Sequence, residues 1–477
     1  MITLTYESFL TDHLAPLHSE SDSLPLEVEG KIPSELMEGI YYKIGPSQRF
    51  IPYGYHHLTD GDGMIHAFRF LQDKIFYSNR WINTQCYELE SRAKRSLFGS
   101  FLFPLEGDRS VRAIKPEKRS KANTNVVYHG ERLLALEESG YPYVLDPISL
   151  KTKQALTSVN GRELHNITAH PKLDQDSGEL HCINWHVLES EPNCTYTVFS
   201  KNGDIKLVHS INLPYRCVIH DFAITKDYII IPIFPLLVDF DCVLKKKEKS
   251  LLHWYSDKGA YIGIMKKDPP FELTWFTIEP CYSLHTSNAY QRGHQIVLDL
   301  VLHNKPPVFN EMMNTTALNE KAQLIRFVFD LEKNCINKIA LDSDDVYYNF
   351  PRIDDRLIGK GYDKTYACGI RGQHKNLLLE SDALISFCHK TNTSSFYYPG
   401  SHYFTSEIVF VARGKDNYLL SLLYNKLTNK SELFIFIAST MLDGPIAIAK
   451  ILHRIPYTFH GNWYDEKNFT SILIDKY

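Results

Sequence analysis

Short runs of apolar and aromatic residues recur along the whole chain, and turn-forming residues separate them. Five clear examples are Tyr228–Pro232, Gln295–Leu302, Ala322–Asp330, Glu407–Ala412 and Tyr418–Tyr424. Turn signals such as Asn202-Gly203-Asp204 and Asp443-Gly444-Pro445 lie between runs of this kind. Long segments with helical periodicity are scarce. Many short strands with regular turns predict an all-β protein, either a sandwich, a barrel or a propeller.

The length of the chain, 477 residues, favours the propeller among these three folds. Seven blades of four strands would use about 17 residues for each strand with its loop. No clean sequence repeat marks the blades, so the number of blades does not follow from the sequence alone. We find no low-complexity linker. We therefore expect a single β-propeller domain over residues 26–477, preceded by an N-terminal arm or short helix over residues 1–25.

Composition and charge exclude several classes of protein. The 52 Lys and Arg residues are outnumbered by 56 Asp and Glu residues, so we expect no nucleic-acid partner, which would require a clustered basic excess. No apolar run approaches the roughly 18 residues of a membrane span, and the N-terminus lacks the basic region of a secretory signal. The nine cysteines form no Cys-x-x-Cys pair and predict reduced thiols in a cytoplasmic protein. We expect a monomer or weak dimer.

Four of the 21 histidines lie where strands are expected to end: His170, His220, His285 and His460. They are 50, 65 and 175 residues apart. Ligands scattered in this way suit a site on a propeller axis, where different blades each contribute one inward side chain. Their spacing does not decide the matter, because a single histidine is more often an ordinary core or surface residue.

The residues around these histidines form an ordered set of motifs. The chain first reads Gly39-Ile40-Tyr41-Tyr42-Lys43-Ile44-Gly45-Pro46 and then Asp60-Gly61-Asp62-Gly63-Met64-Ile65-His66. Further motifs follow in order: Ala135-Leu136-Glu137-Glu138-Ser139-Gly140, Thr168-Ala169-His170-Pro171-Lys172, His220-Asp221-Phe222, Phe350-Pro351-Arg352 and Phe459-His460-Gly461. From Gly39 to Trp463 the set resembles the carotenoid cleavage oxygenases. That family normally opens with Gly-x-Tyr-x-Arg-Asn-Gly-Pro, followed by Asp-Gly-Asp-Gly-Met-[Ile/Val]-His.

The resemblance implies a seven-bladed β-propeller, with a cap of loops and short helices over an iron site on the axis. It implies one iron(II) per chain and dioxygen as co-substrate. The implied iron ligands, which are also the expected catalytic residues, are His170, His220, His285 and His460. Neutral imidazole suits iron(II), and four such ligands leave room in an octahedron for dioxygen or water.

The resemblance also implies partners for the second ring nitrogens of the ligands, which fix the orientation of each ring. In the family, three of the four histidines use a glutamate. Glu138 matches the partner of the second histidine, and Glu407 matches the partner of the fourth. At the position of the third partner this chain has Asn349. An asparagine can accept a hydrogen bond but brings no charge, so the site would hold iron with two carboxylates instead of three.

The resemblance leaves the substrate open. Stilbene-cleaving members carry a lysine directly before the residue matched by Glu138, and a tyrosine on an earlier strand. Here these positions hold Glu137 and Trp81, which favours an apolar polyene, a carotenoid or apocarotenoid, over a phenolic stilbene. We expect a dioxygenase that cleaves a carbon–carbon double bond to carbonyl products. The alternatives are a stilbene-cleaving dioxygenase, an isomerase that uses iron as a Lewis acid, and a non-catalytic propeller that binds an apolar ligand.

An insoluble polyene has to come from a membrane, so we expect peripheral contact with one. The best candidate follows two cations, Lys94 and Arg95, which suit anionic headgroups. Its expected membrane-contact residues are Leu97, Phe98, Phe101, Leu102 and Phe103, four of which have helical spacing. The alternative is that the same segment belongs to the ordinary core.

Overall fold

The computed structural model describes residues 10–52, 57–101, 103, 107–164, 166–186, 191–244, 250–307, 322–342, 345–371 and 380–469. The five strands expected from the apolar runs are all present. They are β17 (Tyr228–Ile233), β23 (Gln295–His303), β24 (Ala322–Asp330), β31 (Ile408–Val411) and β32 (Tyr418–Asn425). Each differs from its predicted range by one residue at most at either end.

Seven sheets of four to six antiparallel strands are the blades of a propeller, which confirms the predicted fold class. In order of hydrogen-bonded neighbours, the first blade consists of β1 (Ser21–Pro25), β5 (Lys74–Trp81), β4 (Asp62–Leu71), β3 (Gly39–Ser47) and β35 (Gly461–Asp465). The second blade consists of β6 (Asn125–His129), β7 (Arg132–Leu136), β8 (Tyr143–Leu145) and β9 (Thr152–Ala155). The third consists of β12 (Lys172–Leu173), β13 (Leu180–Trp185), β14 (Asn193–Phe199) and β15 (Ile205–Asn212).

The remaining four blades follow in chain order. The fourth blade consists of β16 (Ala223–Ile224), β17, β20 (Ala260–Lys266) and β21 (Leu273–Ile278), and the fifth of β22 (Thr286–Arg292), β23, β24 and β25 (Cys335–Ala340). The sixth consists of β26 (Val346–Arg352), β27 (Lys364–Arg371), β28 (Ala383–Cys388) and β29 (Thr393–Tyr397). The seventh consists of β31, β32, β33 (Lys430–Ile437), β34 (Ala447–Lys450) and β2 (Glu27–Gly30), and β30 (Tyr403–Phe404) also pairs with β32.

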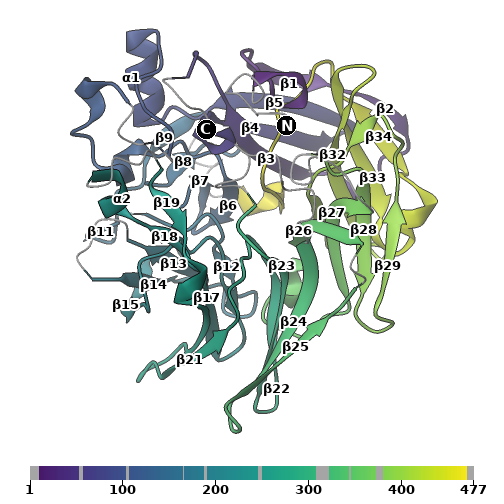
Figure 1. The fold of residues 1–477 in the computed structure, drawn as a ribbon. Helices are drawn as coiled ribbons and strands as arrows, with labels where there is room; N and C mark the ends of the chain where they lie inside the picture. Colours follow the sequence, from purple (N-terminus) through teal and green to yellow (C-terminus); the bar gives the residue numbers. More distant parts are fainter. Residues whose placement is uncertain are drawn as a thin grey trace.

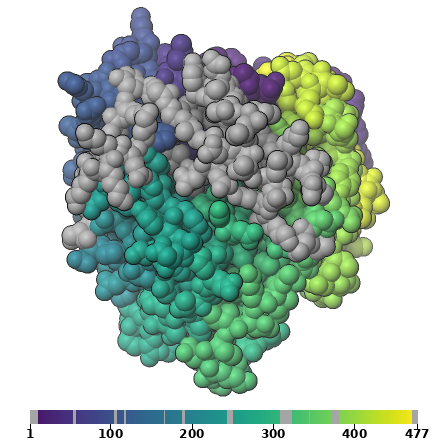
Figure 2. Space-filling model, viewed as in Figure 1, coloured from purple at the N-terminus to yellow at the C-terminus, as the bar shows by residue number. Residues whose placement is uncertain are grey.

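The two ends of the chain close the ring together. Strand β35 pairs with β3, with Gly461 opposite Lys43, and strand β2 pairs with β34. Figure 1 shows the purple N-terminal strands beside the yellow C-terminal ones, and in Figure 2 the same two ends of the chain adjoin along the top of this face. Strand β1, which lies within the arm predicted for residues 1–25, is the outer strand of the first blade.

The innermost strand of each blade faces the axis. Neighbouring innermost strands contact one another, as β16 does β22, β26 does β31, β31 does β35 and β35 does β6. Because each sheet is packed on both faces, its central strands are almost continuously apolar, as in Ile229–Ile233 of β17. This packing holds the inner strand ends, and the residues that precede them, in fixed positions.

Short elements lie outside the blades. They are the helices α1 (Gln85–Ala93) and α2 (Phe240–Leu244), the strand pair β10 (Ser158–Val159) and β11 (Arg162–Glu163), and the strand pair β18 (Leu236–Val238) and β19 (Leu252–Trp254). Short 3₁₀ segments lie at Asp12–Leu14, Ser34–Leu36, Leu58–Asp60, Arg109–Val111, Pro116–Arg119, Ser256–Lys258, Asp355–Leu357, Ala438–Asp443 and Glu466–Phe469. Over the residues that the structure describes, no helix is long and apolar enough to cross a membrane. The nine cysteines are unpaired, and all but Cys335 and Cys388 are buried.

Candidate metal centre

The four candidate ligands each stand just before an innermost strand. His170 lies two residues before β12, His220 three before β16, and His285 and His460 directly before β22 and β35. These strands belong to four different blades, so their starting points meet only around the propeller axis. The ring of blades thereby brings together four side chains that are far apart in the sequence.

The four imidazole rings converge at one place. The metal-binding atoms of His170, His220 and His285 all lie within 4.8 Å of one another. The Nε2 atoms of His170 and His220 are 3.0 Å apart. The ring centre of His460 is 4.5 Å from that of His170 and 5.0 Å from that of His285. All four candidate ligands predicted from the sequence therefore form one cluster.

Two glutamates determine which ring nitrogen of their partner carries the proton. His220 Nδ1 contacts the Glu138 carboxylate, and His460 Nδ1 lies 2.9 Å from Glu407 Oε1. Since a carboxylate only accepts hydrogen bonds, both Nδ1 atoms donate, and both Nε2 atoms keep a free lone pair. Glu138 and Glu407 thus occupy the places that the sequence predicted for them.

The cluster fits a metal cation. His285 Nε2 is buried and makes no hydrogen bond within the described part of the chain. Two nitrogen ligands at right angles and about 2.1 Å from a metal would be about 3.0 Å apart, which is the separation of His170 Nε2 and His220 Nε2. At that distance the two nitrogens either share a proton in a hydrogen bond or both bind one cation through their lone pairs. Imidazole nitrogens suit iron(II), among other divalent metals.

Electrostatics keeps most of the cluster neutral. Burial, followed by the neighbouring imidazoles, holds the pKa values of His170 and His285 well below the usual range of histidine. Burial also lowers the pKa of His460, against the opposing effect of Glu407. At His220 burial is outweighed by Glu138, which raises the pKa. Neutral imidazole is the form that binds a metal, so the lowered pKa values of His170, His285 and His460 favour metal binding.

Glu407 is the centre of a buried ionic network that the sequence analysis did not find. Its Oε2 accepts hydrogen bonds from Lys43 Nζ and the Gly461 N–H, both at 2.8 Å, and its Oε1 accepts one from Arg352 Nη1 at 2.9 Å. The side chains of Lys43 and Glu407 are fully buried. Lys43 and Arg352, beside His460, hold the pKa of Glu407 well below its usual range although burial opposes this. The signal available in the sequence was one lysine in the otherwise apolar run of β3.

Replacing Lys43 by methionine should weaken both the fold and the metal centre. The change leaves the Glu407 carboxylate buried with one cation fewer, which typically costs about 3 kcal/mol or more of unfolding free energy. We also expect weaker iron(II) binding, because Glu407 orients His460. Urea unfolding and titration of the metal-free protein with iron(II) measure the two effects.

Arg326→Met is the matched control for Lys43→Met. Arg326 forms an equally close ion pair with the buried Asp299 at 2.8 Å, between the two central strands of the fifth blade, β24 and β23, and neither residue contacts the four candidate ligands in the described part of the chain. We expect this variant to lose stability and to keep its iron(II) affinity. Equal iron(II) affinity in both variants and in the wild-type protein would contradict the role assigned to Lys43.

Asn349, predicted as the partner of the third ligand, lies on β26 and is buried. Its Oδ1 accepts the Phe350 N–H at 3.0 Å, and its side chain also hydrogen-bonds the Tyr457 hydroxyl. The strand bulges here, and Phe350 has a left-handed φ of 48°. The bulge places the Phe350 ring 5.2 Å from the His285 ring and 5.1 Å from the His460 ring. The role of Asn349 as a partner of His285 stays a prediction.

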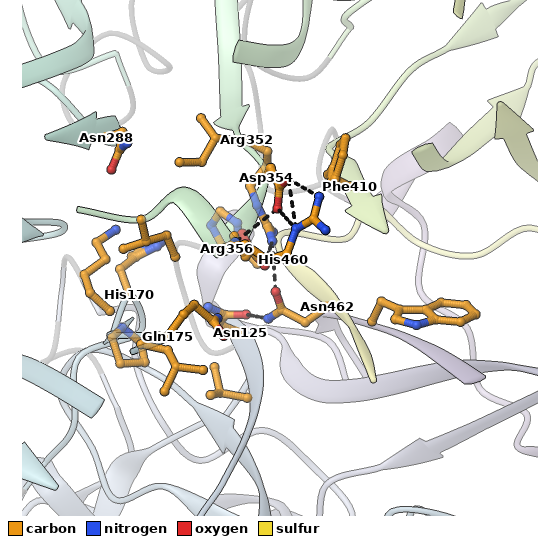
Figure 3. Close-up of a pocket in the computed structure, with 18 of the residues that line it drawn as sticks. Asn125, His170, Gln175, Asn288, Arg352, Asp354, Arg356, Phe410, His460 and Asn462 are labelled. Atoms are coloured by element: carbon orange, nitrogen blue, oxygen red, sulfur yellow. Dashed lines mark hydrogen bonds and ion pairs between the residues drawn. The ribbon is translucent and has the colours of Figure 1, made fainter. Parts of the chain in front are cut away.

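A cavity of about 510 Å³, lined by both polar and apolar side chains, adjoins the metal centre. His170, His285 and His460 line one part of it, together with Glu407. Figure 3 shows His170 and His460 at its wall, with Asn125 and Asn462 hydrogen-bonded to each other close by.

Glu137 and Trp81, the two positions that bear on the choice of substrate, both make contacts with other residues of the protein. Glu137 is half-buried, and its carboxylate accepts hydrogen bonds from the Lys121 N–H and the Ser139 hydroxyl. Burial raises the pKa of Glu137. Trp81 is buried against Tyr87, with the Arg49 guanidinium 5.7 Å from its ring. Trp81 is therefore packed as a core residue.

The segment expected to contact a membrane does not form the helix that its spacing suggested. Helix α1 ends at Ala93, and Lys94 is left-handed with φ 54°. The N–H groups of Leu97 and Phe98 instead donate to Glu90 of α1. Leu97 and Phe103 are buried, which corrects their expected exposure; Phe98 and Phe101 are half-buried, and Leu102 lies outside the described residues. Membrane contact by Phe98, Phe101 and Leu102 stays a prediction.

Comparison with known proteins gives matches over nearly the whole chain. The family described as retinal pigment epithelial membrane protein matches residues 14–465. Isoeugenol monooxygenase of Pseudomonas nitroreducens is 28% identical over 95% of this chain and 97% of its own. Lignostilbene-α,β-dioxygenase isozyme III of Sphingomonas paucimobilis is 28% identical, with coverage of 96% and 97%. A solved variant of Synechocystis apocarotenoid oxygenase superposes with a TM-score of 0.84 at 25% identity, with coverage of 98% and 100%.

Proposed function

This chain belongs to the family of the retinal pigment epithelial membrane protein and the carotenoid cleavage oxygenases, iron-dependent oxygenases that cleave carbon–carbon double bonds. From that premise we propose that it is an iron(II)-dependent dioxygenase that cleaves one double bond of a carotenoid or apocarotenoid. One dioxygen is consumed for each bond cleaved, and its two oxygen atoms end in the two carbonyl products, so no external reductant is needed. The ligands are His170, His220, His285 and His460.

The observation that carries this proposal is the state of the four imidazoles. They come from four blades and meet at one place, and the Nδ1 atoms of His220 and His460 donate hydrogen bonds to Glu138 and Glu407, which leaves the Nε2 lone pairs of these two rings free for a metal. A chain kept only for binding an apolar ligand would not need four histidines arranged in this way. This argues against the non-catalytic alternative.

The protein contributes binding and orientation, and no acid or base has to be assigned. Iron(II), when bound, supplies the site at which dioxygen is activated beside the alkene. The Glu138 carboxylate keeps the His220 ring in one tautomer, and Glu407 does the same for His460. Lys43 and Arg352 neutralise Glu407, so that this buried carboxylate does not have to be protonated. The packed inner strands hold these groups in place without substrate.

The proposed substrate is an apolar polyene, and Glu137 supports this choice. A phenolic substrate would need a cation or a donor near its phenol oxygen, and the position before Glu138 has a carboxylate that already accepts two hydrogen bonds. A carboxylate repels a phenolate oxygen. A carotenoid or apocarotenoid carries no such charge, so the Glu137 carboxylate does not weaken its binding.

Stilbene cleavage is the second candidate, and one of the similar proteins is named for lignostilbene. Two of the similar proteins are named for isoeugenol and lignostilbene, while the solved neighbour is named for an apocarotenoid, all at 25 to 28% identity. These degrees of similarity are nearly equal. The choice between the two substrates therefore depends on the residues of the site.

Oxygen uptake with matched substrates tests the proposal. We expect the iron(II)-loaded protein to consume one dioxygen per bond cleaved with a long apocarotenal and to release two carbonyl products, identified by mass spectrometry. A 4-hydroxystilbene and its 4-methoxy analogue are the comparison pair. Faster uptake with the hydroxystilbene would favour the second candidate. Product without oxygen uptake would indicate an isomerase, and binding without product a non-catalytic protein.

We also propose that the protein takes up its substrate by peripheral contact with a membrane from the cytoplasmic side. The support is the low solubility of polyenes in water, together with the half-buried Phe98 and Phe101 next to Lys94 and Arg95. Binding to vesicles with and without anionic lipid tests this contact, and equal recovery of the protein with and without vesicles would contradict it.

A further inference from the structure

Asp221 lies next to the ligand His220, and its carboxylate reaches the segments of two other ligands. Its Oδ2 accepts hydrogen bonds from the N–H and the hydroxyl of Thr286, both at 2.8 Å. Its Oδ1 pairs with Lys172 Nζ at 2.6 Å. Thr286 directly follows His285, and Lys172 lies two residues after His170. One carboxylate therefore contacts segments that carry three of the four histidines.

This arrangement is strongly built. Asp221 is 7% exposed, and its Oδ1 also accepts the Phe222 N–H at 2.8 Å, so the carboxylate has four donors, of which one is a cation. Charged hydrogen bonds of this kind are about twice as strong as neutral ones. Lys172 is itself largely buried and lies over the Phe222 ring at 5.9 Å. Among the described residues, the group of side chains placed to hold a metal does not include Asp221.

The three contacted segments belong to three different blades. Lys172 begins β12, Asp221 precedes β16, and Thr286 begins β22. Backbone pairing within a blade fixes a strand against its own sheet, and it does not by itself set the distance between strands of neighbouring blades. A metal centre tolerates errors of only about 0.5 Å in the placement of its ligands. A side chain that bonds to three blades close to the ligands can fix the distances between those blades.

We propose that Asp221 is a positioning residue that sets the spacing of His170, His220 and His285 by tying their three blades together. Glu138 and Glu407 each orient one ring, whereas Asp221 acts on the backbone that carries the rings. This inference rests on the proposed iron centre.

The test uses Asp221→Asn in the full-length protein, with iron(II) alone as the first probe. An asparagine can still accept from Thr286, but its amide cannot pair with Lys172. Loss of an outer partner of a metal ligand typically lowers metal affinity about 10- to 100-fold, and we expect a decrease of that size. Competition with a chromogenic iron(II) chelator measures it. The visible spectrum of the cobalt(II)-loaded protein should also change, because it reports the arrangement of the ligands.

Asp146→Asn is the matched control. Asp146 is 5% exposed, accepts the N–H groups of Ile148 at 3.1 Å and Ser149 at 2.9 Å, and pairs with Lys153 at 3.6 Å. It forms the same kind of contacts within a single blade. We expect Asp146→Asn to lose stability and to keep both the iron(II) affinity and the cobalt(II) spectrum.

Two further variants keep the proposal testable if Asp221→Asn does not fold. Lys172→Met and Thr286→Val each remove one contact, and each should weaken iron(II) binding less than the loss of the carboxylate, while Lys172→Arg should restore it. Unchanged affinity and an unchanged cobalt(II) spectrum in the folded variants would overturn the role of Asp221 alone. A wild-type protein that takes up no iron(II) would overturn the proposed function and this role with it.

Discussion

Replacing any one of His170, His220, His285 or His460 by alanine is expected to remove most of the iron and all oxygen uptake. The wild-type protein should hold one iron(II) per chain, as purified or after reconstitution. Each alanine removes one of four imidazoles whose nitrogens meet within a few ångströms of one another. Elemental analysis of the folded variants and an oxygen electrode measure the two losses.

His181→Ala is the control for these four variants. His181 is also a buried histidine, with its Nδ1 2.7 Å from the Tyr196 hydroxyl, on a strand of the third blade outside the cluster. This variant should keep its iron even if its stability falls. Zinc as the sole tightly bound metal in active protein would contradict the assignment of iron.

The strands of the blades could be predicted from the sequence because each strand has a recognisable local pattern of apolar residues. Alternating or continuous apolar runs such as Ala322–Asp330 mark strands at nearly the right limits. The closure of the ring has no such pattern. The pairing of Gly461 with Lys43 joins residues from opposite ends of the chain, and the sequence around either residue does not identify the other as its partner.

The candidate ligands could be found because each lies in a short motif, but the groups that hold the ligands could not all be found. Glu138 and Glu407 occupy the predicted positions beside His220 and His460. Lys43 and Arg352 occur in two of the motifs, but the sequence did not indicate their role, because Glu407, the partner that they share, is distant in the sequence. A contact between blades depends on the folded ring and not on local pattern.

The helical spacing of the apolar residues from Leu97 to Phe101 does not correspond to a helix, for a local reason. Its apolar spacing suits a helix, but Lys94 takes the left-handed conformation that ends α1. Glu90 then accepts the N–H groups of Leu97 and Phe98, which fixes an irregular segment against the helix. Apolar periodicity alone therefore misjudged a segment whose hydrogen bonds go to a neighbouring side chain.

Asn349→Glu is expected to tighten iron(II) binding. In the resembling family this position carries the carboxylate partner of the third ligand, and a partner of that kind typically changes metal affinity about 10- to 100-fold. A glutamate would add a negative charge near a divalent cation. The Tyr457 hydroxyl, which hydrogen-bonds Asn349, could donate to the new carboxylate. Titration of the metal-free variant with iron(II) against the wild-type protein gives the comparison.

Asn349→Gln separates the effect of charge from that of side-chain length. Glutamine has the length of glutamate and the neutral amide of asparagine, so it should not reproduce the gain. The pocket has Asn349 Oδ1 on the Phe350 N–H at a bulge where Phe350 is left-handed, and a longer side chain has to keep or replace that bond. If Asn349→Glu binds iron(II) as the wild-type protein does or more weakly, the pocket has adapted to asparagine, and two carboxylates are the complete set for this centre.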